Sequence, residues 1–229
     1  MAYFFLKQQG VLTKVASSQI DFEKKSVSFQ QNCEVSNVAI GDRTISFDYK
    51  PCAFPFYRDR PYAAAEKLTP MTEELNSEII SVKGLTPGEY MLVMDGKNLG
   101  VYSQSALDTG VNIAVIPDSP TQGHSKIIHQ ANLLRHRWEQ KLRTIRFVEY
   151  SPRNRKIDME NAGTVREFLE LELEKMRDEP YYLFFKDQTK MYYALKPGEE
   201  QILRQIEKSG REIRTKNVPV SYQVSIFAV

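Results

Sequence analysis

The hydrophobic pattern of the chain changes its period once, near Pro117, and this change constrains the fold more than any other feature of the sequence. In residues 11–116 apolar residues tend to alternate with polar ones, as at Ile45, Phe47 and Tyr49. A period of two is typical of strands that bury one face. After Pro117, apolar residues recur every third or fourth position, which is typical of amphipathic helices. We therefore expect a β-rich region followed by a helical region.

Turn signals separate the expected strands of the first region. Asp95-Gly96 predicts a hairpin, because this dipeptide favours the tight turn between antiparallel strands. Gly41-Asp42 predicts another turn, and the proline-containing residues 51–76 are expected to form a long surface connection. Strands at this spacing are typical of a small antiparallel sandwich. The strand-like segments are residues 26–30, 37–40, 43–49, 79–82, 89–94 and 99–102.

Three helices are expected in the second region. The first begins with a capping box at residues 119–122, and the second begins with another at residues 164–167. The third begins near Pro197 and stops before Pro219, and the alternating residues 220–226 predict a closing strand. The apolar stripe of the first helix is formed by Ile127, Ala131, Leu134, Trp138, Leu142, Ile145 and Val148.

The expected fold class is α+β, with an N-terminal apolar helix, a small antiparallel β-sandwich-like region, then long amphipathic helices and a closing strand. Three parts follow from these patterns: a helix in residues 1–10, a β-rich region in residues 11–118, and a helical region with a terminal strand in residues 119–229. The first helix is expected to end at Gly10, since glycine accepts the left-handed conformation found after helix ends.

Charge and composition narrow the classes of partner. The 31 basic and 29 acidic residues leave a net charge of +2, which gives no argument for a nucleic-acid partner. No apolar segment approaches the roughly 20 residues that a membrane span needs, so no membrane partner is expected. The first residues lack the basic and long apolar regions of a signal peptide. Cys33 and Cys52 are compatible with one disulfide in an oxidising compartment or with two free thiols.

Common catalytic and cofactor motifs are absent from the sequence, including the nucleophile elbow, the phosphate-binding loop and the zinc-binding helix. Residues 41–44 read Gly-Asp-Arg-Thr, with Arg43 where a hydrolase of the Gly-Asp-Ser-Leu type needs its serine, so we interpret them as a turn. Residues 110–112 are interpreted as structural for a similar reason. We assign no catalytic, cofactor-binding or metal-binding residue and expect no cofactor. The three histidines are expected on exposed or half-buried helix faces: His124, His129 and His136.

Two blocks in the middle of the chain match a known family in order and spacing. The first, residues 82–96, contains Gly-Leu-Thr-Pro-Gly-Glu-Tyr, and the second joins residues 103–107 to residues 110–114. Together they resemble the C-terminal region of bacterial SGNH/GDSL-type ester hydrolases, in which this region follows a catalytic α/β domain. The resemblance implies hydrolysis of acyl esters, esters of carbohydrates included, and export to the periplasm or the cell exterior, although this chain has no signal peptide of its own.

By the same resemblance, the serine, glycine, asparagine and histidine blocks of the family lie upstream of Met1, which looks like an internal methionine. The chain would then be a truncated, non-catalytic C-terminal portion of such an esterase and inactive alone. Tyr3, Phe4, Phe5 and Leu6 would form an exposed patch that binds the missing catalytic domain.

A free-standing module that binds a glycan or a protein is the second hypothesis. Exposed aromatic rings stack on sugars and anchor interfaces. The same rings could instead cover the core beneath a long loop, and both interpretations stay open at this point. The clustered aromatic residues are Tyr49, Phe54, Phe56, Tyr57 and Tyr62.

Overall fold

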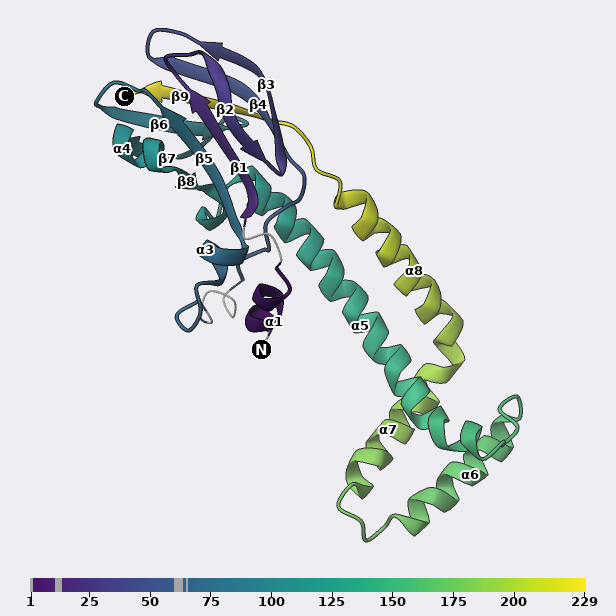
Figure 1. The fold of residues 1–229 in the computed structure, drawn as a ribbon. Helices are drawn as coiled ribbons and strands as arrows, with labels where there is room; N and C mark the ends of the chain where they lie inside the picture. Colours follow the sequence, from purple (N-terminus) through teal and green to yellow (C-terminus); the bar gives the residue numbers. More distant parts are fainter. Residues whose placement is uncertain (1, 11–13, 60–63, 65) are drawn as a thin grey trace. The chain divides into compact units, whose positions relative to one another are not determined.

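The computed structural model describes residues 2–10, 14–59, 64 and 66–229, and it has the α+β architecture predicted from the sequence (Figure 1). The chain divides into two units. The β unit contains Met1–His129 and Arg214–Val229, and the helical unit contains Gln130–Ile213.

Two sheets form the centre of the β unit. The four-stranded sheet has the order β2-β1-β5-β8 and the five-stranded sheet has the order β3-β4-β9-β6-β7. All neighbouring pairs are antiparallel except β1 and β5, because the chain crosses to the other sheet for β3 and β4 before it returns at β5. The strands are β1 (Lys14–Asp21), β2 (Ser26–Gln31), β3 (Cys33–Ile40), β4 (Thr44–Pro51), β5 (Ser77–Lys83), β6 (Glu89–Met94), β7 (Lys97–Ser103), β8 (Val111–Asn112) and β9 (Tyr222–Ala228).

The core of the β unit lies between these sheets and confirms the alternating sequence pattern. Strand β4 buries every second side chain, and the neighbouring strand β9 does the same. The buried residues of β4 stand directly opposite those of β9, so that each apolar side chain has a cross-strand partner. The partners are Ile45 and Ile226, Phe47 and Val224, and Tyr49 and Tyr222.

The last strand, β9, lies inside the five-stranded sheet, between β4 and β6. It therefore belongs to the β unit, although the long helices precede it in the sequence. The division of the chain into these two units differs from the boundary expected after residue 118. The strand returns to the sheet because Tyr222, Val224 and Ile226 supply an apolar face that the core requires.

Two predicted turns are confirmed. Asp95 and Gly96 have φ values of 47° and 74° and join β6 to β7, as expected for a two-residue hairpin turn with both residues left-handed. Gly41 lies between β3 and β4, and its N–H donates to the carbonyl of Thr44 at 2.9 Å. The Gly41-Asp42 segment is thus a turn between strands.

Cys33 and Cys52 are free thiols. Cys33 pairs with Pro51 across β3 and β4, whereas the N–H of Cys52 donates to the carbonyl of Asn32 at 2.8 Å. Side chains alternate between the faces of a sheet, so the two cysteines lie on opposite faces. Cys33 is buried and its thiol contacts the carbonyl of Ser17 at 3.3 Å, while Cys52 is exposed.

The N-terminal helix α1 (Ala2–Gln8) exposes only part of its expected aromatic patch. Phe4 and Phe5 are each 61% exposed, and Leu6 is half-buried. Tyr3 is buried instead, because its hydroxyl donates to Glu74 at 2.6 Å. Glu74 lies in helix α3 (Met71–Leu75), which attaches α1 to the β unit.

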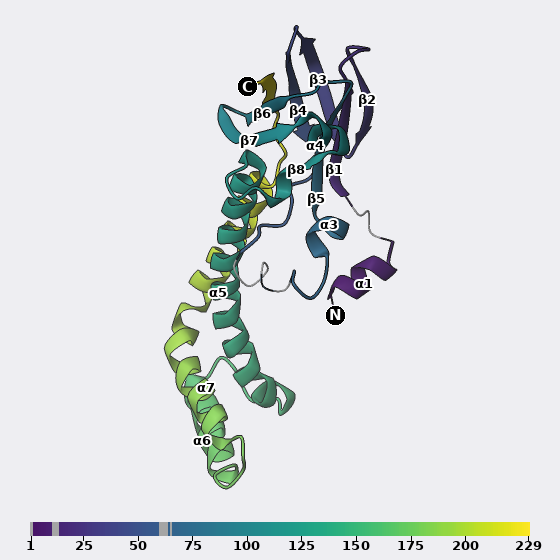
Figure 2. The same ribbon diagram turned by 90° about the vertical axis from the view of Figure 1, so that its left-hand side faces the viewer.

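The helical unit, whose helices are drawn in Figure 2, has a hydrophobic core of its own. The long helix α5 (Pro120–Asn154) begins in the β unit, and α6 (Ala162–Lys175), α7 (Tyr182–Leu195) and α8 (Glu199–Lys216) follow it. A short 3-10 helix, η2 (Lys196–Gly198), lies between α7 and α8, whereas the β unit contains the short helices α4 (Gln104–Thr109) and η1 (Ile113–Val115). The helical core contains Ile145, Val148, Val165, Leu169, Tyr192 and Ile202.

None of the described helices combines the length and the hydropathy that crossing a bilayer requires.

Candidate functional site

Each unit contains one glutamate that is completely buried, Glu78 in the β unit and Glu149 in the helical unit. A buried carboxyl group is costly unless hydrogen bonds or opposite charges compensate it. Groups of this kind also occur at catalytic sites, where burial and neighbours shift pKa values. The contacts of each glutamate decide between a catalytic and a structural role.

Glu78 lies on β5 and faces the core, where two hydroxyl groups donate to it. The Tyr49 hydroxyl on β4 donates to one carboxyl oxygen at 3.0 Å, and the Thr121 hydroxyl on α5 donates to the other at 2.8 Å. The Ser119 hydroxyl lies 3.3 Å from that of Thr121. We call these four residues the Glu78 cluster.

Burial raises the pKa of Glu78 to about 7, although the hydrogen bonds from Thr121 and Tyr49 lower it. Burial and the nearby Glu78 carboxyl also raise the pKa of Tyr49 well above its ordinary value. The cluster thus holds a carboxyl group that titrates near neutral pH inside the protein.

The surroundings of the cluster indicate a structural role. The Ser119 hydroxyl accepts from the N–H of Gln122 at 3.3 Å, as the predicted capping box requires. One turn later, the Ser125 hydroxyl donates to the carbonyl of Pro55 at 2.6 Å. Ser119, Thr121 and Glu78 are each 0% exposed. The cluster fastens the first turn of α5 to the sheets and offers no opening to a substrate.

His124 is the imidazole closest in sequence to this cluster, and its contacts do not form a catalytic relay. Its Nδ1 atom forms a hydrogen bond of 2.7 Å with the Tyr222 hydroxyl, and its ring stacks on Phe54 at a centroid distance of 5.0 Å. A catalytic relay places the imidazole between the nucleophile and the carboxylate. Here the Thr121 hydroxyl donates directly to Glu78.

The other two histidines lie where the sequence predicts, on half-buried or exposed helix faces. His129 lies 3.8 Å from Asp59, and His136 contacts Gln140 at 3.1 Å. Within the described ranges, no three histidine, cysteine or acidic side chains form a group that could hold a metal ion.

Open cavities of the β unit contain hydroxyls without an imidazole. One of about 460 Å³ contains the ion pair of Arg58 and Glu66 beside Thr69 and Thr72. Another cavity, of about 500 Å³, is lined by residues that include Ser105, Thr109 and Asn112. Among the described lining residues of both cavities there is no histidine, so neither cavity pairs a hydroxyl with an imidazole.

The Gly110-Val111-Asn112 segment has the structural role that we expect. The Asn112 side chain accepts from the N–H of Ala114 at 3.1 Å and from the N–H of Glu78 at 3.0 Å. Gly110 has φ 113°, and an added Cβ would lie 2.6 Å from a methyl carbon of Ile79. Backbone conformation and close packing therefore both require glycine there.

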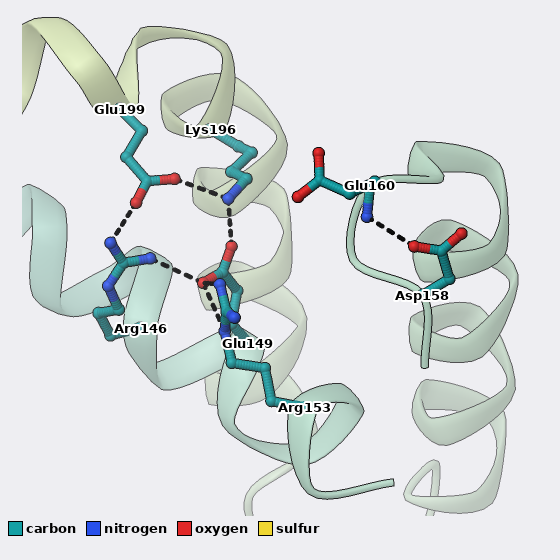
Figure 3. A network of polar contacts seen from close by, with 7 residues as sticks. All are labelled: Arg146, Glu149, Arg153, Asp158, Glu160, Lys196 and Glu199. Carbon is teal, nitrogen blue, oxygen red and sulfur yellow. Dashed lines mark hydrogen bonds and ion pairs between the residues drawn. The ribbon is translucent and has the colours of Figure 1, made fainter. Parts of the chain in front are cut away.

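Glu149, on α5, forms an ion network with three cationic side chains (Figure 3). Arg146 and Arg153 each donate to its Oε2 atom at 2.8 Å, and Lys196 donates to Oε1. Lys196 also donates to Glu199 at 2.6 Å, and Arg146 pairs with Glu199. We call these five residues the Glu149 network.

Burial would raise the pKa of Glu149, but the hydrogen bonds from Lys196, Arg153 and Arg146 outweigh it, and the pKa lies below its ordinary value. Burial likewise opposes a charge on Lys196, yet its bonds to Glu149 and Glu199 raise its pKa. Glu149 and Lys196 thus keep their charges at neutral pH. A carboxylate bound by three cations stabilises the helical unit and is a poor base.

Sequence reasoning missed both glutamates, although a signal existed for each. The alternation of Ile80 and Val82 extends back to Glu78, which places it on the inward face of the strand. Glu149 follows Val148 in the apolar stripe, with Arg146 three residues before it and Arg153 four residues after it. These spacings place the two arginines on the same helix face as Glu149.

Replacement of Glu78 by glutamine is expected to change the pH dependence of stability. Because the folded pKa of about 7 exceeds the ordinary 4.5, the folded protein binds more protons, and its stability falls as the pH rises from about 4.5 to 7. Above pH 7, Glu78→Gln is expected to stabilise the protein by up to about 3 kcal/mol, because it removes the cost of ionisation. Urea unfolding at pH 5 and pH 8 measures this difference. The exposed Glu34→Gln is the control, and an equal pH dependence in both variants would contradict the assignment.

Replacement of Glu149 by glutamine is expected to destabilise the helical unit by about 1–3 kcal/mol at neutral pH, because three cationic groups lose their shared acceptor. Since the pKa of Glu149 is lowered, its contribution is complete above its ordinary pKa and is lost as the pH falls through the lowered value. Helical circular dichroism during urea unfolding measures the loss.

The matched control for this variant is Glu200→Gln, which breaks an exposed pair with Arg204 in the same unit. An exposed pair of this kind contributes roughly 0.3–0.5 kcal/mol. Equal losses in the two variants would show that Glu149 has no special role.

No protein-family model matches the chain, and no curated protein sequence matches it. Among solved structures, a gut microbial diltiazem-metabolizing enzyme has a similar fold, with a TM-score of 0.78 and 25% sequence identity. The match covers 100% of this chain and 53% of the enzyme, so the chain spans about half the length of the structure it matches. The chain therefore has the fold of part of an enzyme, a likeness compatible with a hydrolase.

Proposed function

We propose that the chain is the non-catalytic C-terminal portion of an SGNH/GDSL-type ester hydrolase. The parent protein would hydrolyse acyl esters, those of carbohydrates included. One observation supports this proposal above the others: the chain matches about half of an enzyme along its whole length, yet the described residues that line the two β-unit cavities include no imidazole.

The chemistry of ester cleavage explains why this observation matters. An ester hydrolase of this type needs a hydroxyl activated by an imidazole and donors positioned for the developing oxyanion. The two hydroxyls that donate to the buried Glu78 carboxyl belong to Tyr49 and Thr121, which are both 0% exposed. His124 is already bound by Tyr222 and stacked on Phe54. On this proposal, both units are scaffold and the reacting groups lie in another part of the parent protein.

The structural neighbour is consistent with this reaction class. Diltiazem contains an acetyl ester, so ester hydrolysis is one of the reactions by which an enzyme can metabolise it. The proposal transfers only this general class to the parent protein, because the chain corresponds to 53% of the neighbour.

Helix α1 supplies the surface that would bind the catalytic domain. Phe4 and Phe5 are adjacent and each 61% exposed, which is unusual for large apolar side chains on one short helix. Tyr3 and Lys7 hold the helix in place through Glu74, at 2.6 Å in each case. The expected four-residue patch thus reduces to Phe4 and Phe5, with Leu6 half-buried at its edge.

The alternative, a free-standing glycan- or protein-binding module, has less support. Tyr49 is 0% exposed and bonds to Glu78, which corrects the expectation that it is presented to a ligand. Phe54 is half-buried against His124, and Tyr62 lies outside the described residues. Phe56, at 63% exposed, and the half-buried Tyr57 are what remains of the aromatic surface.

An esterase assay tests the proposed function. The purified chain is incubated with nitrophenyl acetate, with and without an organophosphate inhibitor, and the protein mass is then measured. We expect no inhibitor-sensitive turnover and no covalent adduct, since the hydroxyl that His124 contacts belongs to Tyr222, which is only 2% exposed and out of reach of an ester. The variant His124→Ala serves as the control, and its turnover should match that of the unsubstituted chain. Turnover that the inhibitor abolishes, or that is lost in His124→Ala, would contradict the proposal.

A further inference from the structure

Helix α5 and helix α7 enclose a groove of about 520 Å³ within the helical unit. This volume lies in the range of small-molecule sites. Leu134, Trp138 and Lys141 lie on one face of α5 at spacings of four and three residues, and Met191 of α7 lies opposite. The two helices also touch further along, where Phe147 packs edge-to-face on Phe184 and Phe185.

The floor of the groove is apolar and incompletely covered. The sequence predicts Leu134 as part of the buried stripe of α5, but this side chain is 46% exposed, as is Met191. Trp138 packs against the helical core and is half-buried. Further along the same stripe, Ile145 and Val148 are fully buried, so only one end of the stripe lacks cover.

Two cationic side chains line the same groove. The Lys141 ammonium lies 4.0 Å from the centroid of the Trp138 ring, and the exposed Arg137 lies one turn before Lys141 on the helix. No acidic residue is among the described residues that line the groove. Glu139, the nearest carboxylate in sequence, pairs with Arg135 at 2.8 Å. The groove therefore has an apolar floor, and Arg137 and Lys141 give its wall a net charge of +2.

We propose that this groove binds an amphipathic organic anion. The apolar body of the ligand lies on Leu134 and Met191, and its carboxylate or sulfonate lies between Arg137 and Lys141. Charge complementarity selects the anionic group, because no carboxylate among the described lining residues competes for the two cations. This inference goes beyond the proposed function and does not depend on it.

The sequence provides a direct probe of the site, because Trp138 is the single tryptophan of the chain. Selective excitation of tryptophan therefore reports this groove alone. Decanoate is titrated into the full chain, and decanol, which has the same apolar body without the charge, is titrated in parallel. We expect a saturable fluorescence change with decanoate and binding of decanol weaker by at least about tenfold.

Three variants separate the parts of the site. Arg137→Gln combined with Lys141→Gln should weaken decanoate binding by about tenfold and leave decanol binding unchanged. Leu134→Ser should weaken both ligands. Arg143→Gln removes an exposed cation from the same helix outside the groove and should change neither. Affinities are taken from half-saturation, because removal of Lys141 alters the starting fluorescence.

The proposal is overturned if decanoate gives no saturable change below the concentration at which it aggregates. It is also overturned if decanol binds as tightly as decanoate, or if Arg143→Gln has the same effect as the double variant. Far-ultraviolet circular dichroism of each variant establishes that its helices are intact, so that weaker binding reports the groove. The esterase assay has a separate readout, and its outcome does not affect this test.

Discussion

The pairing of β9 with β4 and β6 is the interaction on which the rest of the structure depends. These three strands form the middle of the five-stranded sheet, and β9 supplies three of its fully buried side chains, Tyr222, Val224 and Ile226. The chain reaches β9 only after the whole helical unit has been traversed. The β unit therefore depends on a contact between distant parts of the sequence. Bringing these parts together costs chain entropy, which the burial of apolar surface then offsets.

The Glu78 cluster fixes the point at which the chain leaves the β unit. Its hydrogen bonds join β5 of one sheet, β4 of the other and the first turn of α5. Nearby, His124 of α5 bonds to Tyr222, the first residue of β9. The start of α5 and the start of β9 are thus tied to the same core. A buried carboxyl with a raised pKa often marks a catalytic site, but here every polar contact holds one element to another.

The sequence was most informative where one physical effect dominated. Alternation predicted the buried residues of β4, and the Asp95-Gly96 pair predicted its hairpin, because local pattern decides both. Helix α7 was missed, since its several aromatic residues do not follow one clear apolar stripe. The helix α6 begins earlier than the predicted capping box, because Asn161 caps it by accepting from the N–H groups of Gly163 and Thr164. The central place of β9 and the contacts of Glu78 arise from tertiary pairing, which local periodicity does not encode.

Hydrogen exchange of the β9 amides is the measurement that tests this account most directly. A terminal strand that merely covers an edge frays, and its amides exchange by local opening. If β9 completes the sheet, the amides of Leu92 on β6, Phe47 on β4 and Val224 on β9 should exchange with the same free energy, that of global unfolding of the β unit. Exchange at Val224 by a low-energy local opening, with Phe47 and Leu92 still protected, would contradict the account.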